Sequence, residues 1–379
     1  MVPHNAQVTI NRSTAARTAN SHPVLRLWAS SFVSTTSFNT ARANKQQKQA
    51  ADVGLLLAGQ VLERTQHSEL TFVMSAQGGK WRNGARAAIA FTIDNMGEAA
   101  DLDRDLWPAS QPVGSHYSVM EVLPQFLDLL RKHDIKATYF IESSNMKLYP
   151  EAIRDVAMAG HEVAWHAWRH EAWSKLDEKA EKANFDRSFG AEGLAGFVSE
   201  GGLGNGVVDQ YRGFRPPGGI IHGDRTLKLC RQHGLSYISP AAEDAALVTL
   251  ENSDDKIAIL PFRWRTVDAF YYMEAFGGLR KAKGEDSDAV QSPETLARQY
   301  IHEIDAAVES DGFLSLLFHP FLTNEPARMK AMETVVEYLV RKRDAGQIWL
   351  ARCRDIADWI HEQPDTVGED PRWDTTSWR

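Results

Sequence analysis

The strongest constraint on the fold is a regular alternation of short apolar runs and helical segments between Ala87 and Gln363. The run Ala87–Ile93 is typical of a buried strand, whereas Tyr117–His133 carries its apolar residues at helical spacing. This alternation recurs about seven times, which predicts a parallel sheet with helices outside it, closed or nearly closed into a barrel. The predicted strands are Ala87–Ile93, Lys136–Ile141, His161–Trp165, a strand starting at Gln210, Leu235–Ser239, Ile257–Trp264, Gly312–Phe318 and Ile348–Ala351.

Polar residues that could carry chemistry follow five of these strands. In a parallel barrel the carboxyl ends of the strands converge on one face, where barrel enzymes keep their active sites. His166 and His170 are four residues apart, so on a helical turn they would lie on one face and could bind one metal ion, although a surface helix with two histidines has the same spacing. The full set is Asp94, Asn95, Glu98, His166, His170, Arg215, Asp268 and His319.

These residue types favour hydrolysis by activated water. Two histidines with a carboxylate or amide oxygen suit a metal with open positions, and a separate carboxylate could take a proton from the bound water. A histidine on the opposite side could protonate a leaving amine. Covalent catalysis is disfavoured, because no serine lies in a nucleophile-elbow pattern and neither Cys230 nor Cys353 lies near a histidine in the sequence.

Composition excludes some functions and divides the chain. The net charge of -8 gives no basic footprint for nucleic acid, and no apolar run reaches the length of a membrane span. Residues 1–50 lack Asp and Glu, which is typical of a transit peptide, while a disordered tail or an incorrect gene start are the alternatives. We therefore expect an N-terminal extension over residues 1–80, a catalytic domain over 81–363 and a tail over 364–379. The expected location is intracellular, cytoplasmic or else mitochondrial if the transit peptide is real.

The motifs resemble those of the NodB-type polysaccharide deacetylases (carbohydrate esterase family 4), including their allantoinase-like and cyclic-imidase-like relatives. The resemblance covers roughly residues 85–363 and implies a distorted (β/α) barrel. The corresponding motifs are Thr92–Asn95 for Thr-Phe-Asp-Asp, His166–His170 for His-Ser/Thr-x-x-His, Arg215–Pro217 for the Arg-Pro turn, Trp264–Asp268 for a weaker fourth motif and Leu316–His319 for a strand ending in His.

The resemblance also implies roles for individual residues. Asp94 would be the general base, oriented by Arg215, and His319 the general acid, with Asp268 tuning Arg215 or His319. His166 and His170 would bind a divalent metal, with zinc expected. The residues expected to shape the substrate pocket are Pro216, Leu317, Trp168 and Trp264.

One position departs from the family pattern, because Asn95 stands where the family has its metal-binding Asp. An amide oxygen is a neutral and poorer ligand than a carboxylate. Asn95 could still bind the metal, Glu98 could supply the missing carboxylate, or the enzyme could work without metal. We expect a metal held by both histidines with Asn95 or Glu98.

The expected function is removal of an acyl group from an N-acylated amino sugar by metal-activated water. The first alternative is an intracellular amidase on a small cyclic amide or ureide, and the second is a non-catalytic sugar-binding barrel. The expected partner is an N-acylated carbohydrate or small amide, with a homo-oligomer as a further possibility. A long aromatic groove would favour a polymer, whereas a closed pocket capped by residues 277–292 or by a neighbouring subunit would favour a small molecule.

Overall fold

The structure is a computed structural model that describes residues 78–199, 208 and 210–376. The described residues belong to one compact unit, Gln77–Arg379. The predicted extension over residues 1–80 lies outside the described residues except for its last three, and so does the Gly-rich loop at residues 201–206. No helix in the described part of the chain is long and apolar enough to span a membrane. Cys230 and Cys353 are both buried free thiols.

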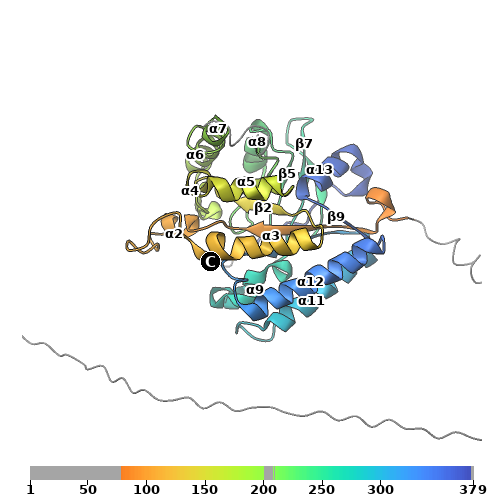
Figure 1. The fold of residues 1–379 in the computed structure, drawn as a ribbon. Coiled ribbons are helices and arrows are strands. Elements are labelled where there is room, and N and C mark those ends of the chain that lie inside the picture. The colour runs from red at the N-terminus through yellow and green to blue at the C-terminus, as the bar shows by residue number, and fades with distance from the viewer. Residues whose placement is uncertain (1–77, 200–207, 209, 377–379) are drawn as a thin grey trace, which may run out of the picture. The chain divides into compact units, whose positions relative to one another are not determined.

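A single curled sheet organises the described residues (Figure 1). The strand order is β6-β7-β5-β4-β3-β2-β1-β8, with β9 also paired to β1. The run from β7 to β8 is parallel throughout, which confirms the predicted parallel sheet, whereas β6 is an unpredicted antiparallel edge strand. The strands are β1 (Ala87–Asp94), β2 (Thr138–Ile141), β3 (Glu162–Trp165), β4 (Gly213–Phe214), β5 (Tyr237–Ile238), β6 (Ala246–Thr249), β7 (Lys256–Ile259), β8 (Phe313–Phe318) and β9 (Ile348–Leu350).

The barrel is distorted because its two sides are joined by little pairing. Among the described residues, Val267 and Leu317 form one isolated parallel bridge between the segment after β7 and strand β8. We call this junction the seam. The fold is therefore the distorted (β/α) barrel predicted from the sequence, with a weakly paired seam in place of a continuous closing ladder.

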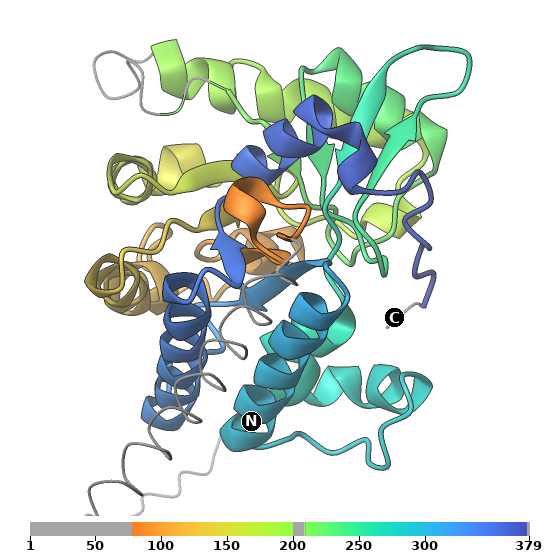
Figure 2. The same ribbon diagram turned by 90° about the vertical axis from the view of Figure 1, so that its right-hand side faces the viewer.

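Helices surround the sheet, as the two perpendicular views show (Figures 1 and 2). The long helices α11 and α12 pack side by side and cover β8, β1 and β9. The helices are α2 (Ala99–Asp103), α3 (Leu123–Lys132), α4 (Asn145–Leu148), α5 (Pro150–Met158), α6 (Glu178–Phe189), α7 (Leu194–Ser199), α8 (Asp224–Gln232), α9 (Asp268–Tyr272), α10 (Gly277–Ala282), α11 (Pro293–Glu309), α12 (Pro326–Asp344) and α13 (Cys353–Glu362), with short helical turns at Arg82–Gly84, Ser118–Val122, Trp173–Lys175, Trp264–Thr266, Glu274–Phe276 and Pro364–Thr366.

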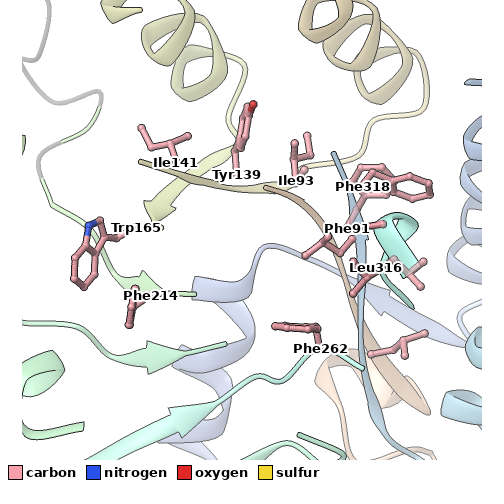
Figure 3. Close-up of a cluster of buried hydrophobic side chains, with 14 of the residues drawn as sticks. Phe91, Ile93, Tyr139, Ile141, Trp165, Phe214, Phe262, Leu316 and Phe318 are labelled. Carbon is pink, nitrogen blue, oxygen red and sulfur yellow. The ribbon is translucent and has the colours of Figure 1, made fainter. Parts of the chain in front are cut away.

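Strand β1 shows how the two faces of the sheet are used. Side chains alternate along a strand, so Ile89, Phe91 and Ile93 share one face and pack with the outer apolar cluster (Figure 3). Ala88 and Ala90 belong to the other cluster, in which small side chains from β1 lie beside larger ones such as Phe140 and Tyr237. Thr92 and Asp94 continue this inward series at the carboxyl end of the strand, so the pleat alone aims Asp94 into the barrel.

The packing of the barrel interior requires a glycine on β4, and helix α13 covers one end of the interior. A Cβ on Gly213 would lie 1.9 Å from the ring of Tyr237, so the tyrosine fills the interior only because β4 has no side chain there. The Tyr237 hydroxyl donates to Glu162 Oε1 at 3.0 Å. The other carboxylate oxygen of Glu162 accepts from the backbone N–H of Arg354 at 2.9 Å, in the first turn of α13. A buried carboxylate thus anchors the amino end of α13, as the helix dipole favours.

Candidate active site

Asp94 and Arg215 form a buried ion pair at the carboxyl ends of β1 and β4. Arg215 Nη1 donates to Asp94 Oδ1 at 2.7 Å, and the two side chains are 1% and 5% exposed. The other guanidinium hydrogen bonds go to hydroxyl groups, namely those of Thr92, Ser239 and Ser315. Asp94 Oδ2 is turned toward the histidine pair and lies 3.9 Å from His166 Nε2. One oxygen of Asp94 is therefore fixed by Arg215, and the other faces the site.

His319 and Asp268 form a second buried pair at the end of β8. His319 Nδ1 bonds to Asp268 Oδ1 at 2.5 Å, while the backbone N–H of His319 and the Thr323 hydroxyl donate to Oδ2, each at 2.8 Å. Burial disfavours the His319 imidazolium, but the charge and hydrogen bond of Asp268 outweigh it and raise the pKa of His319. Asp268 thus acts on His319, and not on Arg215, which the sequence had left open.

His166 and His170 come together in a loop, as their position directly after a predicted strand indicated. The loop follows β3, and both Ala167 (φ +69°) and His170 (φ +67°) adopt left-handed backbone conformations. The two rings are edge to face, with centroids 4.9 Å apart. His166 Nδ1 donates to the Arg215 carbonyl at 2.6 Å, and burial lowers the pKa of His166 to about 4. His170 Nδ1 lies 3.1 Å from Nη2 of Arg104.

Asn95 is bound to a buried glutamate. Its φ of +59° turns the chain after β1, and its Nδ2 donates to Glu142 Oε1 at 2.6 Å. Glu142 Oε2 accepts from the Met96 N–H at 3.0 Å and from Asn145 Nδ2 at 3.1 Å. Burial raises the pKa of Glu142 to about 8 even though these donors oppose the rise. Asn95 still lines the cavity described below, but its amide nitrogen is committed to Glu142.

The structure does not bring Glu98 to the histidines, which corrects its expected role as a ligand. Gly97 has φ +60°, and this turn carries Glu98 away from β1. The Glu98 carboxylate is fully buried, where it accepts from the Gly114 N–H and the Tyr149 hydroxyl. Within the described part of the chain, no group of three or more His, Cys, Asp or Glu side chains is placed to hold a metal ion. The His, Cys, Asp and Glu side chains of the described residues therefore do not by themselves supply a three-ligand site for the divalent metal that the family resemblance implies.

One cavity of about 400 Å³ joins these groups. Nine of the predicted site residues line it, and two further segments wall it, residues 97–117 and 262–276. The insertion at residues 277–292, considered as a cap from the sequence, contributes none of the lining side chains. The nine predicted residues are Asp94, Asn95, His166, His170, Arg215, Pro216, Trp264, Leu317 and His319.

The tryptophans at and after the end of β3 belong to the core, which corrects the expectation for Trp168. Trp168 does not line the cavity. Its ring lies under the guanidinium of Arg187 at 4.1 Å, and its backbone N–H donates to Asn184, so it faces α6. Trp165 and Trp173 pack edge to face, with centroids 5.7 Å apart, among the rings of the outer core. Trp264, by contrast, lines the cavity as expected.

Sequence reasoning missed the wall formed by the segment between β1 and α3. Arg104 and His116 line the cavity from this segment, together with Tyr117. His116 is buried, and burial lowers its pKa. The available signal was position alone, because a long connection after the first strand of a predicted barrel lies on the active-site face.

Known proteins share the domain and the fold. The polysaccharide deacetylase family profile matches residues 113–238. A peptidoglycan-N-acetylglucosamine deacetylase of Bacillus cereus is 33% identical over 116 residues, which are 30% of this chain and 48% of that protein. The chain spans less than half the length of three curated relatives that it matches, two of them peptidoglycan-N-acetylglucosamine deacetylases, with shares between 22% and 48%.

Solved structures show the same architecture over most of the chain. A Mycobacterium smegmatis protein assigned to the polysaccharide deacetylases has a TM-score of 0.61 at 24% identity, covering 78% of this chain and 96% of that one. An allantoinase has a TM-score of 0.57 at 17% identity, covering 75% and 93%. At these identities the likeness shows the fold alone. Together with the motifs and the profile match over residues 113–238, it supports the resemblance to the NodB-type polysaccharide deacetylases predicted from the sequence.

Proposed function

We propose that the protein hydrolyses the carbon–nitrogen bond of a small amide, with Asp94 as general base and His319 as general acid. The observation that carries the proposal is that two buried pairs, Arg215–Asp94 and Asp268–His319, present one base and one acid to the same cavity. A relative named for deacetylating the N-acetylglucosamine of peptidoglycan supports an amide as the substrate class.

Asp94 is suited to take a proton from water. Oδ1 is held by Arg215, so Oδ2 is the oxygen that faces the cavity, 3.9 Å from His166 Nε2. Because a carbonyl oxygen only accepts, the bond from His166 to the Arg215 carbonyl places the proton on Nδ1. In the neutral ring Nε2 then accepts, so a water between these two atoms can donate one hydrogen to each. Its oxygen lone pair is left to attack the amide carbonyl carbon.

His319 is suited to protonate the leaving nitrogen. Asp268 fixes Nδ1, so Nε2 is the atom that the ring can offer to a substrate, and the raised pKa of His319 favours the protonated form. As the water oxygen bonds to the carbonyl carbon, its proton passes to Asp94. The carbon–nitrogen bond then breaks as the nitrogen takes a proton from His319. The products are a carboxylic acid and an amine, joined in one molecule if the substrate is cyclic.

The cavity favours a small substrate over a polymer. Its volume of about 400 Å³ is in the range of sites for single small molecules. Apolar side chains wall one part of it, including Phe262, Met273 and Phe276. This supports a single N-acylated amine or a cyclic amide over a long glycan chain.

The test is a panel of small amides: N-acetylglucosamine, its short oligomers, and five- and six-membered cyclic imides and ureides, followed by NMR of substrate and product. We expect turnover of at least one small amide, reduced about 10²–10⁴-fold in kcat/KM by Asp94→Asn or His319→Asn. Asp358→Asn and His361→Asn, on α13 and outside the cavity lining, are matched controls that should keep wild-type rates. No turnover of any compound, or unchanged rates in the two site variants, would overturn the proposal.

A further inference from the structure

The two histidines that would bind a metal differ in what surrounds them. His166 has a ligand-like arrangement, because its Nδ1 donates to the Arg215 carbonyl and its Nε2 faces the cavity side of Asp94. His170 has a cation beside it, since Nη2 of Arg104 lies 3.1 Å from its Nδ1. A guanidinium can only donate hydrogen bonds, so His170 Nδ1 must accept, and the proton of the neutral ring is then on Nε2. In this arrangement His170 offers a metal no lone pair.

The acidic side chains near the pair are committed elsewhere. Asp94 is ion-paired with Arg215, and Glu98 is bound by Gly114 and Tyr149. Asn95 stands where the family resemblance places a carboxylate, and an amide brings no negative charge. A divalent ion here would meet the guanidinium of Arg104, and the carboxylate beside His166, that of Asp94, is already neutralised by Arg215.

Arg104 is itself well placed to act on a substrate. It follows α2 directly and lines the cavity together with Asp94, His170 and His319. Among the described residues that line the cavity, the other guanidinium is that of Arg215, whose hydrogen bonds go to Asp94 and three hydroxyl groups. Arg104 is half-buried and has five N–H donors, so it can bind His170 and an oxygen of a ligand together.

We propose that Arg104 is the resident cation of this site: it excludes a divalent metal from the histidine pair, and its guanidinium binds the carbonyl oxygen of the substrate. The second part rests on the proposed function, whereas the first part does not. In the reaction Arg104 donates hydrogen bonds to the oxygen on which negative charge develops as the water attacks, which is how fixed donors lower such barriers. The substrate class that fits is a small amide whose carbonyl enters the cavity between Arg104 and Asp94.

The first experiment measures zinc and needs no substrate. Wild type, Arg104→Gln and Asn95→Asp/Arg104→Gln are dialysed against zinc, their folding is checked by thermal unfolding, and bound metal is measured per chain. We expect wild type to retain far less than one zinc, and the double variant to approach one zinc that is lost when His166→Ala is added. One zinc per wild-type chain, lost in His170→Ala, would overturn the proposal. So would a folded double variant that retains no more zinc than wild type.

The second experiment uses a small amide that the wild type hydrolyses. Arg104→Gln should lower kcat about 10²–10³-fold, as loss of one oxyanion donor does in other enzymes, and Arg104→Lys should recover part of that loss. Arg187→Gln is the matched control, because Arg187 lies against Trp168 and outside the cavity lining. Equal rates for Arg104→Gln and wild type would overturn the role in binding the carbonyl. If the wild type hydrolyses no amide, the proposed function fails, and the zinc result still decides whether Arg104 excludes metal.

Discussion

Replacing Arg215 by methionine should cost the fold far more than replacing a surface arginine, and the cost should depend on Asp94. Arg215→Met removes five hydrogen bonds from a guanidinium that is 1% exposed. The hydroxyl groups it leaves can partly satisfy one another, since Thr92 also bonds to Ser315 and to the Leu316 carbonyl. The Asp94 carboxylate cannot, because it remains buried without its cation. Breaking a buried ion pair in this way costs about 3–5 kcal/mol of unfolding free energy.

The assay is a double-mutant cycle by guanidinium unfolding at pH 7. In an Asp94→Asn background Arg215→Met strands no carboxylate and removes a guanidinium that has already lost its anion, so it should cost at most about 1–2 kcal/mol, the scale of lost neutral hydrogen bonds. Arg212→Met is the matched control: its ion pair with Asp358 is half exposed, so the expected cost is at most about 1 kcal/mol. An equal cost of Arg215→Met in both backgrounds would refute the charge argument. It would leave packing of the arginine against Phe140, 4.1 Å away, as the source of the stability.

Two further predictions follow from the titrating groups. Asp268→Asn should lower the pKa of His319, because the charge and hydrogen bond of Asp268 are what raise it. The alkaline limb of the kcat/KM profile should then move to lower pH, and kcat/KM should fall about tenfold for each pH unit above that limb. A limb that does not move would show that His319 is not the titrating acid. His161 accepts the Ala137 N–H, and burial lowers its pKa to about 4 from 6.5, so its contribution to stability is complete above pH 6.5 and is lost as the pH falls toward 4. His161→Gln should remove about 2–3 kcal/mol of the acid sensitivity between pH 7 and pH 4.5 in urea unfolding, and an identical pH dependence in wild type and variant would contradict this.

Strands that are buried along their whole length were predictable from the sequence. Strand β1 is buried along its whole length and reads as one apolar run, so its bounds differ from the prediction by one residue. Strand β6 was missed, because its apolar run, Ala245–Val248, is short and the strand ends in the exposed Thr249 at the antiparallel edge of the sheet.

The site was predictable where a strand end fixes it and not where backbone turns redirect the chain. Asp94, Arg215 and His319 follow buried strands, so their convergence on one cavity could be inferred from topology. Spacing misled for Glu98, because Gly97 at φ +60° redirects the chain after β1. The loop position of the two histidines followed from the strand before them, but nothing in the sequence marks Ala167 for its left-handed conformation. Arg104 comes from a connection whose path depends on tertiary contacts alone.

The seam of the barrel has a consequence for how ligands enter. Val267 and Leu317, which form its isolated bridge, both line the cavity. The cavity wall therefore coincides with the edge of the sheet that has the least backbone pairing among the described residues. Separation of the two segments at the seam would widen the cavity while every strand ladder stays intact. Local opening at the seam therefore requires no movement of a separate loop. In native-state hydrogen exchange, the backbone amides at this bridge would then exchange before those in the middle of β1 and β2.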